Sequence, residues 1–188
     1  MLGDMSAWKR QETGQHQEAV LPPPRSPGDL YRICMVCLGN ICRSPTAEVV
    51  LRDELRKVGL DGRVIVDSAG TGDWHLGQAM HPGARAELAR RGLDGSRHRA
   101  RQIDRSWLDR YDLLLAMDSR NMAGLRRMAA GRPELEGRIL MFRSFDPEAP
   151  ADADVPDPYD GGPDEFADVF DLVSDAAAGL ARQLAKTL

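Results

Sequence analysis

The stretch Val36–Glu48, with the sequence VCLGNICRSPTAE, joins a short apolar run to a helical pattern. The run YRICMVC, Tyr31–Cys37, has the length and composition of a buried strand. A turn follows, and then Ser44 and Pro45, of which proline suits the first position of a helix and serine is a candidate N-cap. The stretch therefore predicts a strand, a tight turn and a helix in direct succession.

The same alternation continues to the C-terminus. Apolar runs predict strands in RVIVDSA (63–69), YDLLLAM (111–117) and RILMF (138–142). Helical periodicity predicts helices in HPGARAELARRG (81–92), in DSRNMAGLRRMAA (118–130) and from Pro163 onward. At the start of the second of these helices, Ser119 is a possible cap and Asp118 a cap or loop anchor. Strands that alternate with helices predict an α/β fold, a four-stranded parallel sheet with helices on both faces. This is a doubly wound, flavodoxin-like three-layer sandwich, in which ligands bind beyond the C-terminal ends of the strands. The quoted stretch lies at such an end.

Composition narrows the class of protein. With 188 residues, 42% hydrophobic and 29% charged, the chain has the composition of one globular domain. No apolar run reaches the roughly 20 residues that span a bilayer, and no apolar leader is visible, so we expect a cytoplasmic protein without a membrane partner. The net charge of −4 gives no bias toward nucleic acid. Eleven acids between Arg143 and Arg182 and eight arginines in Arg85–Arg110 indicate two solvated faces or a field that steers a charged partner.

The N-terminal residues 1–29 differ from the rest in having few large apolar side chains. We expect a disordered N-terminal extension there, and one domain over residues 30–188. The segment PPPRSP within the extension is a mere tail or a polyproline ligand for a partner module.

All three cysteines, Cys34, Cys37 and Cys42, fall within nine residues. A structural zinc or iron–sulfur site needs four ligands, and no further cysteine exists, so we expect no metal. Cys34 and Cys37 point to opposite faces of a strand, which opposes a disulfide between them and makes Cys34 a core residue. Cys37 and Cys42 could approach each other, and a reversible bridge between them would switch off a reactive thiol.

A nucleophilic Cys37 explains more of the pattern. Gly39 and Asn40 tolerate the positive φ of a turn that aims backbone N–H groups inward, and the following helix adds its positive N-terminus. Arg43 supplies a planar fork that matches two phosphate oxygens. Together these groups would lower the pKa of the Cys37 thiol, and Ser44 could donate a hydrogen bond to its sulfur. The stretch therefore predicts a thiolate that meets a bound anion.

This pattern closely resembles the signature of low-molecular-weight protein-tyrosine phosphatases. The resemblance continues through VDSAGTGDWHLG, HRARQI, DLLLAMDSRN and DPYDGGPDEF, and covers about Tyr31–Leu188. Within bacterial members, SAGTGDWH and RSFDP look most like an actinobacterial type. The resemblance implies an enzyme that hydrolyses phosphotyrosine in proteins through a phosphocysteine intermediate, without metal or other cofactor.

The resemblance also assigns roles to single residues. It implies Cys37 as the nucleophile, Arg43 as the phosphate clamp and Asp157 as the general acid that protonates the leaving oxygen and later activates water. It places Trp74 and Tyr159 on the walls of the substrate cleft. Substrate contacts would come from the loop residues Leu38, Gly39, Asn40, Ile41, Cys42 and Ser44, while Ser68 and His98 would brace the loop. Its expected partner is a phosphotyrosine protein, such as a tyrosine kinase, and the enzyme is expected to be a monomer.

The sequence departs from the family pattern after Asp-Pro-Tyr, where Asp160 replaces a second tyrosine. The segment GLDGSRH is one residue longer than usual, which could displace His98. Three other functions share parts of this pattern. An arsenate reductase with an internal cysteine relay would need a cysteine after Cys42, which the sequence lacks, whereas an arsenate reductase that borrows external thiols stays open as an alternative. A protein-arginine phosphatase typically has threonine where Ile41 stands, and a silent phosphotyrosine-binding module would usually lack the nucleophile or the acid.

Overall fold

The computed structural model describes residues 19–188. In chain order it contains β1 (Tyr31–Cys37), α1 (Arg43–Lys57), β2 (Val64–Gly70), α2 (Pro82–Arg90), η1 (Arg105–Trp107), β3 (Leu113–Ala116), α3 (Ser119–Met128), η2 (Pro133–Arg138), β4 (Ile139–Met141), η3 (Phe142–Phe145) and α4 (Pro163–Thr187). The four strands and four α-helices lie where the alternation predicts them. The 3-10 helices η1, η2 and η3 are too short to show a periodic pattern of apolar residues, so the sequence does not predict them.

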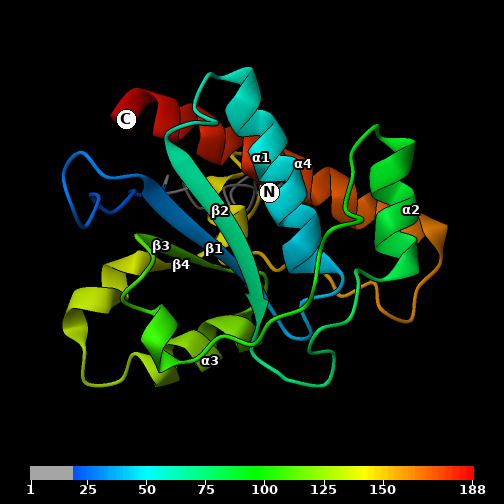
Figure 1. Cartoon of the computed structure of the whole chain (residues 1–188), viewed down its shortest axis with the longest axis horizontal. Helices are drawn as coiled ribbons and strands as arrows, with labels where there is room; N and C mark the ends of the chain where they lie inside the picture. The colour runs from blue at the N-terminus through cyan, green and yellow to red at the C-terminus, as the bar shows by residue number, and fades with distance from the viewer. Residues whose placement is uncertain (1–18) are drawn as a thin grey trace, which may run out of the picture.

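The strands form one parallel sheet in the order β2-β1-β3-β4. Figure 1 shows α3 on one side of this sheet and α1 with α4 on the other. The predicted three-layer α/β fold is confirmed. Because β2 lies on one side of β1 and β3 on the other, the chain changes direction at β1, and the end of β1 is a topological switch point.

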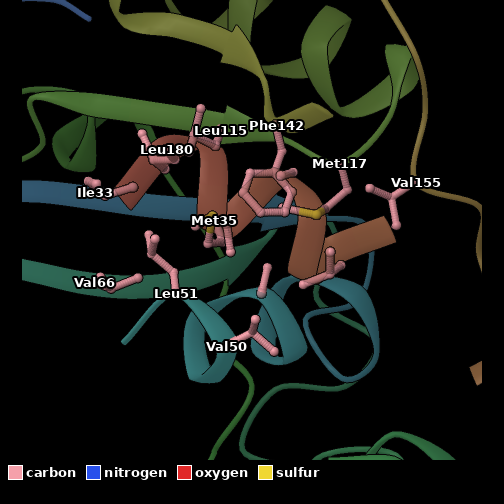
Figure 2. Packing of buried hydrophobic residues seen from close by; sticks show 14 of the residues in the cluster. Ile33, Met35, Val50, Leu51, Val66, Leu115, Met117, Phe142, Val155 and Leu180 are labelled. Atoms are coloured by element: carbon pink, nitrogen blue, oxygen red, sulfur yellow. The ribbon is translucent and has the colours of Figure 1, made fainter. Parts of the chain in front are cut away.

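Side chains of β1 alternate between two hydrophobic cores. Ile33, Met35 and Cys37 belong to the larger core, which α1 and α4 cover, and Figure 2 shows Ile33 and Met35 among its residues. Cys34 and Val36 point to the other face and pack in the smaller core beneath α3. Cys34 is fully buried, as expected for a core residue. Burial of each large aliphatic side chain contributes about 1.5–3 kcal/mol, so the two cores hold the end of β1 in place.

The start of α1 differs from the prediction, and at the start of α3 the structure decides between two predicted caps, Asp118 and Ser119. α1 begins at Arg43, so Ser44 lies inside the first turn and is not the N-cap. The N-cap of α3 is Asp118, whose carboxylate accepts a hydrogen bond from the Asn121 amide (2.7 Å), and Ser119 is the first helical residue. The Ser44 side chain instead faces the Cys37 sulfur, as described below. Its position is therefore determined by contacts at the site and not by helix capping.

The chain before β1 contacts the domain within the described residues. The Arg25 guanidinium donates to the carbonyl groups of Tyr111 and Leu108 (both 2.9 Å), and its backbone N–H donates to Asp112 (2.6 Å). The Tyr31 hydroxyl donates to the Pro22 carbonyl (2.9 Å). Part of the PPPRSP segment is thus engaged with the domain. Residues 1–18 of the expected extension lie outside the described part, and the domain boundary after residue 29 stays a prediction.

Over residues 19–188, no helix combines the length and apolar character needed to cross a bilayer.

Candidate active site

Residues 38–42, the Cys37 loop, curl around the Cys37 sulfur at the end of β1. The Asn40 amide donates to Sγ at 3.2 Å, and the Ser44 hydroxyl lies 3.0 Å from it. Asn40 has a φ of 55°, the left-handed conformation predicted for this turn. The loop thus brings one backbone donor and one hydroxyl to the sulfur.

A chain of hydrogen bonds fixes the direction of the Ser44 hydroxyl. The Asn40 side-chain amide donates to Ser44 Oγ (2.8 Å) and to Ser68 Oγ (2.9 Å). Ser68 in turn donates to Glu48 Oε2 (2.5 Å), while the other carboxylate oxygen, Oε1, pairs with Arg52 on the same helix (2.7 Å). Because Ser44 Oγ accepts from Asn40, its own proton is available to a second group, either the Cys37 sulfur at 3.0 Å or the more distant Ala69 carbonyl at 3.4 Å.

The outer side of the loop is braced by two further residues. The Arg101 backbone N–H donates to Asn40 Oδ1 (2.8 Å), and His98 Nε2 lies 2.6 Å from the Asn40 carbonyl oxygen. Burial lowers the pKa of His98 below its usual value, although the hydrogen bond to the Asn40 carbonyl acts in the opposite direction. A neutral ring with its proton on Nε2 fits this contact. The longer GLDGSRH segment therefore does not move His98 away from the loop.

Arg43 is buried in the first turn of α1 and links three segments of the chain. Its guanidinium donates to Asp118 (2.6 Å), to the Val155 carbonyl (3.1 Å) and to Asp157 (2.7 Å). Burial would lower the pKa of Arg43, but the nearby Cys37 and the hydrogen bond to Asp118 outweigh it and raise the pKa. Its Nε is buried without a hydrogen-bond partner among the described residues, so one donor of the fork is left over.

Asp157 lies on the acid loop, residues 146–162. Its Oδ2 faces Arg43, its Oδ1 accepts from the Tyr159 amide (3.3 Å), and its side chain remains 43% exposed. The loop is attached just before it, where the Val155 amide donates to the Met117 carbonyl (2.7 Å) and Asp154 accepts from the Ser119 amide (2.8 Å). The carboxyl group of Asp157 is thus held beside the guanidinium and open to solvent.

The two loops enclose a cleft of about 660 Å³. Of the residues that the sequence singles out, the cleft is lined by Cys37, Leu38, Gly39, Ile41, Cys42, Arg43, Trp74, Asp157 and Tyr159. Asn40, Ser44, Ser68 and His98 belong instead to the hydrogen-bond network around the loop. Trp74 and Tyr159 are 68% and 47% exposed, so each presents a large aromatic surface at the rim.

Sequence reasoning did not single out His75, Glu48 or Arg101 and gave Asp118 only a capping or anchoring role. His75 lines the cleft and lies over Gly39, where an added Cβ would come within 2.8 Å of its ring. Asp118 caps α3 as predicted and also binds Arg43. His75 and Asp118 stand inside quoted motifs, but no local pattern reveals their contacts across the fold.

Residues 32–188 match the family described as low molecular weight phosphotyrosine protein phosphatase. The chain belongs to this family. A protein-tyrosine phosphatase of Streptomyces coelicolor is 46% identical over 80% of this chain and 91% of its own length. The protein-tyrosine-phosphatase YfkJ of Bacillus subtilis is 39% identical over 84% of this chain and 97% of its own length. The similarity to a Streptomyces enzyme agrees with the predicted actinobacterial type.

Solved structures agree with this assignment. The crystal structure of YfkJ from Bacillus subtilis has a TM-score of 0.77 and 36% identity, covering 86% of this chain and 98% of that one. A protein tyrosine phosphatase from Entamoeba histolytica has a TM-score of 0.78 and 32% identity, covering 83% and 97% of the two chains. The protein is thus a protein-tyrosine phosphatase by family, and enzymes of this class are phosphoric monoester hydrolases.

The two cysteines of this phosphatase cleft have different surroundings. Burial, followed by the nearby charge of Asp157, raises the pKa of Cys42 to about 12, so its thiol keeps its proton at neutral pH. Cys37, in contrast, receives a hydrogen bond from the Asn40 amide and faces the Ser44 hydroxyl. Both thiols are free in the structure. The hydrogen-bond donors of the loop are therefore gathered at Cys37 and not at Cys42.

Proposed function

We propose that this phosphatase hydrolyses phosphotyrosine in proteins through a phosphocysteine formed on Cys37, without a metal ion. The observation that carries the proposal is the placement of Arg43 between the Cys37 loop and Asp157. It supports the proposal because Cys37, Arg43 and Asp157 surround one cleft, and transfer of a phosphoryl group to sulfur requires a nucleophile, an anion-binding group and a proton donor.

Binding of the phosphate changes the partners of Arg43. In the free protein one guanidinium nitrogen is hydrogen-bonded to Asp157. A bound dianion competes for this nitrogen, and Arg43 keeps its hydrogen bond to Asp118 while it turns its free edge toward the phosphate oxygens. Once Arg43 has turned to the phosphate, the Asp157 carboxyl no longer binds the guanidinium and can donate a proton to the leaving phenolic oxygen.

The first step then proceeds by in-line displacement. The Cys37 sulfur forms a bond to phosphorus while the bond to the phenolic oxygen breaks and that oxygen takes the proton of Asp157. The loop amides and Arg43 stabilise the negative charge on the equatorial oxygens. In the second step Asp157 takes a proton from water, which attacks phosphorus and releases the thiolate and inorganic phosphate. Ser44 stabilises the thiolate as it leaves.

The cleft supports an aryl phosphate as substrate. Trp74 and Tyr159 present aromatic surfaces at the rim of the cleft, and Ile41 adds an apolar side chain to its wall. The ring of a phosphotyrosine can pack against these apolar side chains, whereas the polar, charged group of a phosphoguanidine would have no polar partner at Ile41. A phosphoprotein such as a tyrosine kinase is the proposed partner, and action as a monomer in the cytoplasm is part of the proposal.

Hydrolysis of p-nitrophenyl phosphate in the presence of a chelator tests the proposal. We expect turnover by the wild type and by Cys34→Ala, a matched control that removes a thiol from the other face of β1. Cys37→Ser should lose activity by at least about 10³-fold, because the hydroxyl is a far weaker nucleophile at neutral pH. A rapid quench should also trap a phosphoryl group on the peptide that contains Cys37. Full activity of Cys37→Ser would refute the mechanism.

A further inference from the structure

A second groove adjoins the active-site cleft on the far side of Tyr159. It has a volume of about 580 Å³ and lies between one side of α2 and the first turn of α4, which pack together (Figure 1). We call it the α2–α4 groove; its lining includes His81, Ala86, Glu87, Arg90, Asp164 and Phe166. Gly161 lines both this groove and the cleft, so the two adjoin at this residue.

The floor of the groove is aromatic. The rings of His81 and Phe166 are stacked with centroids 5.0 Å apart, and Tyr159 lies 5.6 Å from His81. A Cβ on Gly83 would come within 2.3 Å of the Phe166 ring, so this ring packs directly on the backbone of α2. Such a floor suits the methylene groups of a long side chain.

The charge at the rim of the groove is negative. Its one lining cation, Arg90, is bound by both carboxylate oxygens of Glu87 (2.6 and 2.8 Å). Asp164 and, at the end shared with the cleft, Asp160 form no ion pair within residues 19–188. The positive end of α4 is offset by Asp164 and by Glu165, whose carboxylate accepts from the Gly162 amide (2.8 Å). A positively charged side chain from another molecule would therefore complement these two acids.

We propose that the α2–α4 groove is a specificity subsite that takes a lysine or arginine of the substrate close to the phosphotyrosine. The inference rests on the proposed function, because the phosphotyrosine in the cleft determines which residues reach the groove. One residue of extended chain spans about 3.3–3.6 Å, so a neighbour within one to three positions can pass Tyr159. Its stem covers Phe166 and His81, and its charge lies between Asp160 and Asp164.

Paired phosphotyrosyl peptides test the subsite. Each pair is identical except for arginine or glutamate at one of the three positions on either side of the phosphotyrosine, and p-nitrophenyl phosphate is the reference substrate. At low salt we expect kcat/KM for arginine to exceed that for glutamate about fivefold at one or more positions, and the ratio to fall in high salt. Equal values at every position, or a preference for glutamate, would overturn the inference.

Two pairs of variants assign the preference to the groove. Asp164→Asn should reduce the arginine-to-glutamate ratio about twofold, whereas Asp168→Asn, an exposed acid on α4 outside the groove, should not change it. Ala86→Arg places a cation in the groove and should abolish the preference, while Ala89→Arg on the same helix but outside the lining should keep it. If both members of a pair behave alike, the groove does not carry the preference.

The reference substrate separates the two possible failures. If the wild type does not hydrolyse p-nitrophenyl phosphate, the proposed function is wrong. If it hydrolyses this ester and shows the same kcat/KM for all peptides, only the subsite is wrong.

Discussion

The Cys37 loop and the acid loop meet at Arg43 but are held in different ways. In the Cys37 loop, Asn40 is buried and its main chain and side chain make hydrogen bonds in several directions. In the acid loop, Asp157 is 43% exposed and contacts Arg43 and its own loop. The difference fits the proposed mechanism, in which the Cys37 loop binds the phosphate and must be preorganised, whereas Asp157 exchanges protons with a substrate oxygen and with water.

Each loop contains one non-glycine residue in the left-handed conformation. Asn40 and Asp152 both have a φ of 55°. Asn40 is 1% exposed and its side-chain amide binds Ser44, Ser68 and the Arg101 amide, whereas Asp152 is exposed to solvent. The same backbone strain is thus compensated by a buried network in one loop and tolerated at a surface turn in the other.

The largest effect is expected from removing the proton donor of the acid loop. Asp157→Ala should lower kcat on phosphotyrosine by about 10²–10³-fold, because the leaving phenolate is then released without a proton. The loss should be smaller for p-nitrophenyl phosphate, whose leaving group is less basic. Inhibition by inorganic phosphate should persist, because the Cys37 loop and Arg43 are intact. An equal loss on both substrates would mean that Asp157 acts through structure and not as an acid.

A comparison of two alanine variants separates backbone strain from the network. Asn40→Ala leaves Ser44, Ser68 and the Arg101 amide without their partner, and should lower the free energy of unfolding by about 3–5 kcal/mol, measured by urea denaturation. Asp152→Ala keeps only the strain and should cost about 1 kcal/mol. Similar losses in both variants would show that the network around Asn40 contributes little.

The sequence predicted those features that depend on nearby residues. Alternating apolar runs indicated the sheet and its helices, and a glycine–asparagine turn after β1 indicated a left-handed residue at the end of a strand. The error at Ser44 has a physical reason: its hydroxyl is taken up by Cys37 and Asn40, so it cannot act as a cap.

Contacts between distant segments could not be predicted. Asp118 binds Arg43 from 75 residues away, and Arg101 reaches Asn40 from 61 residues away. No local sequence pattern connects residues that are so far apart in the chain, because these segments come together only when the parallel sheet forms. Roles of residues such as Asp157 and Tyr159 were carried by the family resemblance, since eleven acids compete in that region of the chain.

A smaller effect is expected from loosening the attachment of the acid loop. Asp154 accepts a hydrogen bond from the Ser119 amide, and its carbonyl accepts one from Arg143 (3.1 Å). Asp154→Ala removes the first contact and should reduce kcat about three- to tenfold through poorer placement of Asp157, with inhibition by phosphate unchanged. Asp152→Asn removes one charge from the same loop without removing a hydrogen bond and should leave kcat unchanged. If it lowers kcat equally, loop charge and not attachment is responsible.

The smallest effect concerns the pH dependence of stability at the brace of the Cys37 loop. Burial lowers the pKa of His98 in the folded protein, whereas in the unfolded chain the pKa is about 6.5. As the pH falls through about 6.5, the unfolded chain therefore takes up a proton that the folded protein does not, and stability decreases toward the lower folded pKa. His98→Gln keeps a neutral donor for the Asn40 carbonyl and lacks this proton uptake. Between pH 7.5 and 5.5 we expect the wild type to lose about 1–2 °C more in Tm than the variant, measured by calorimetry. An equal or larger loss in His98→Gln would show that His98 accepts a proton in the folded state and that the brace is not the neutral ring inferred from its burial.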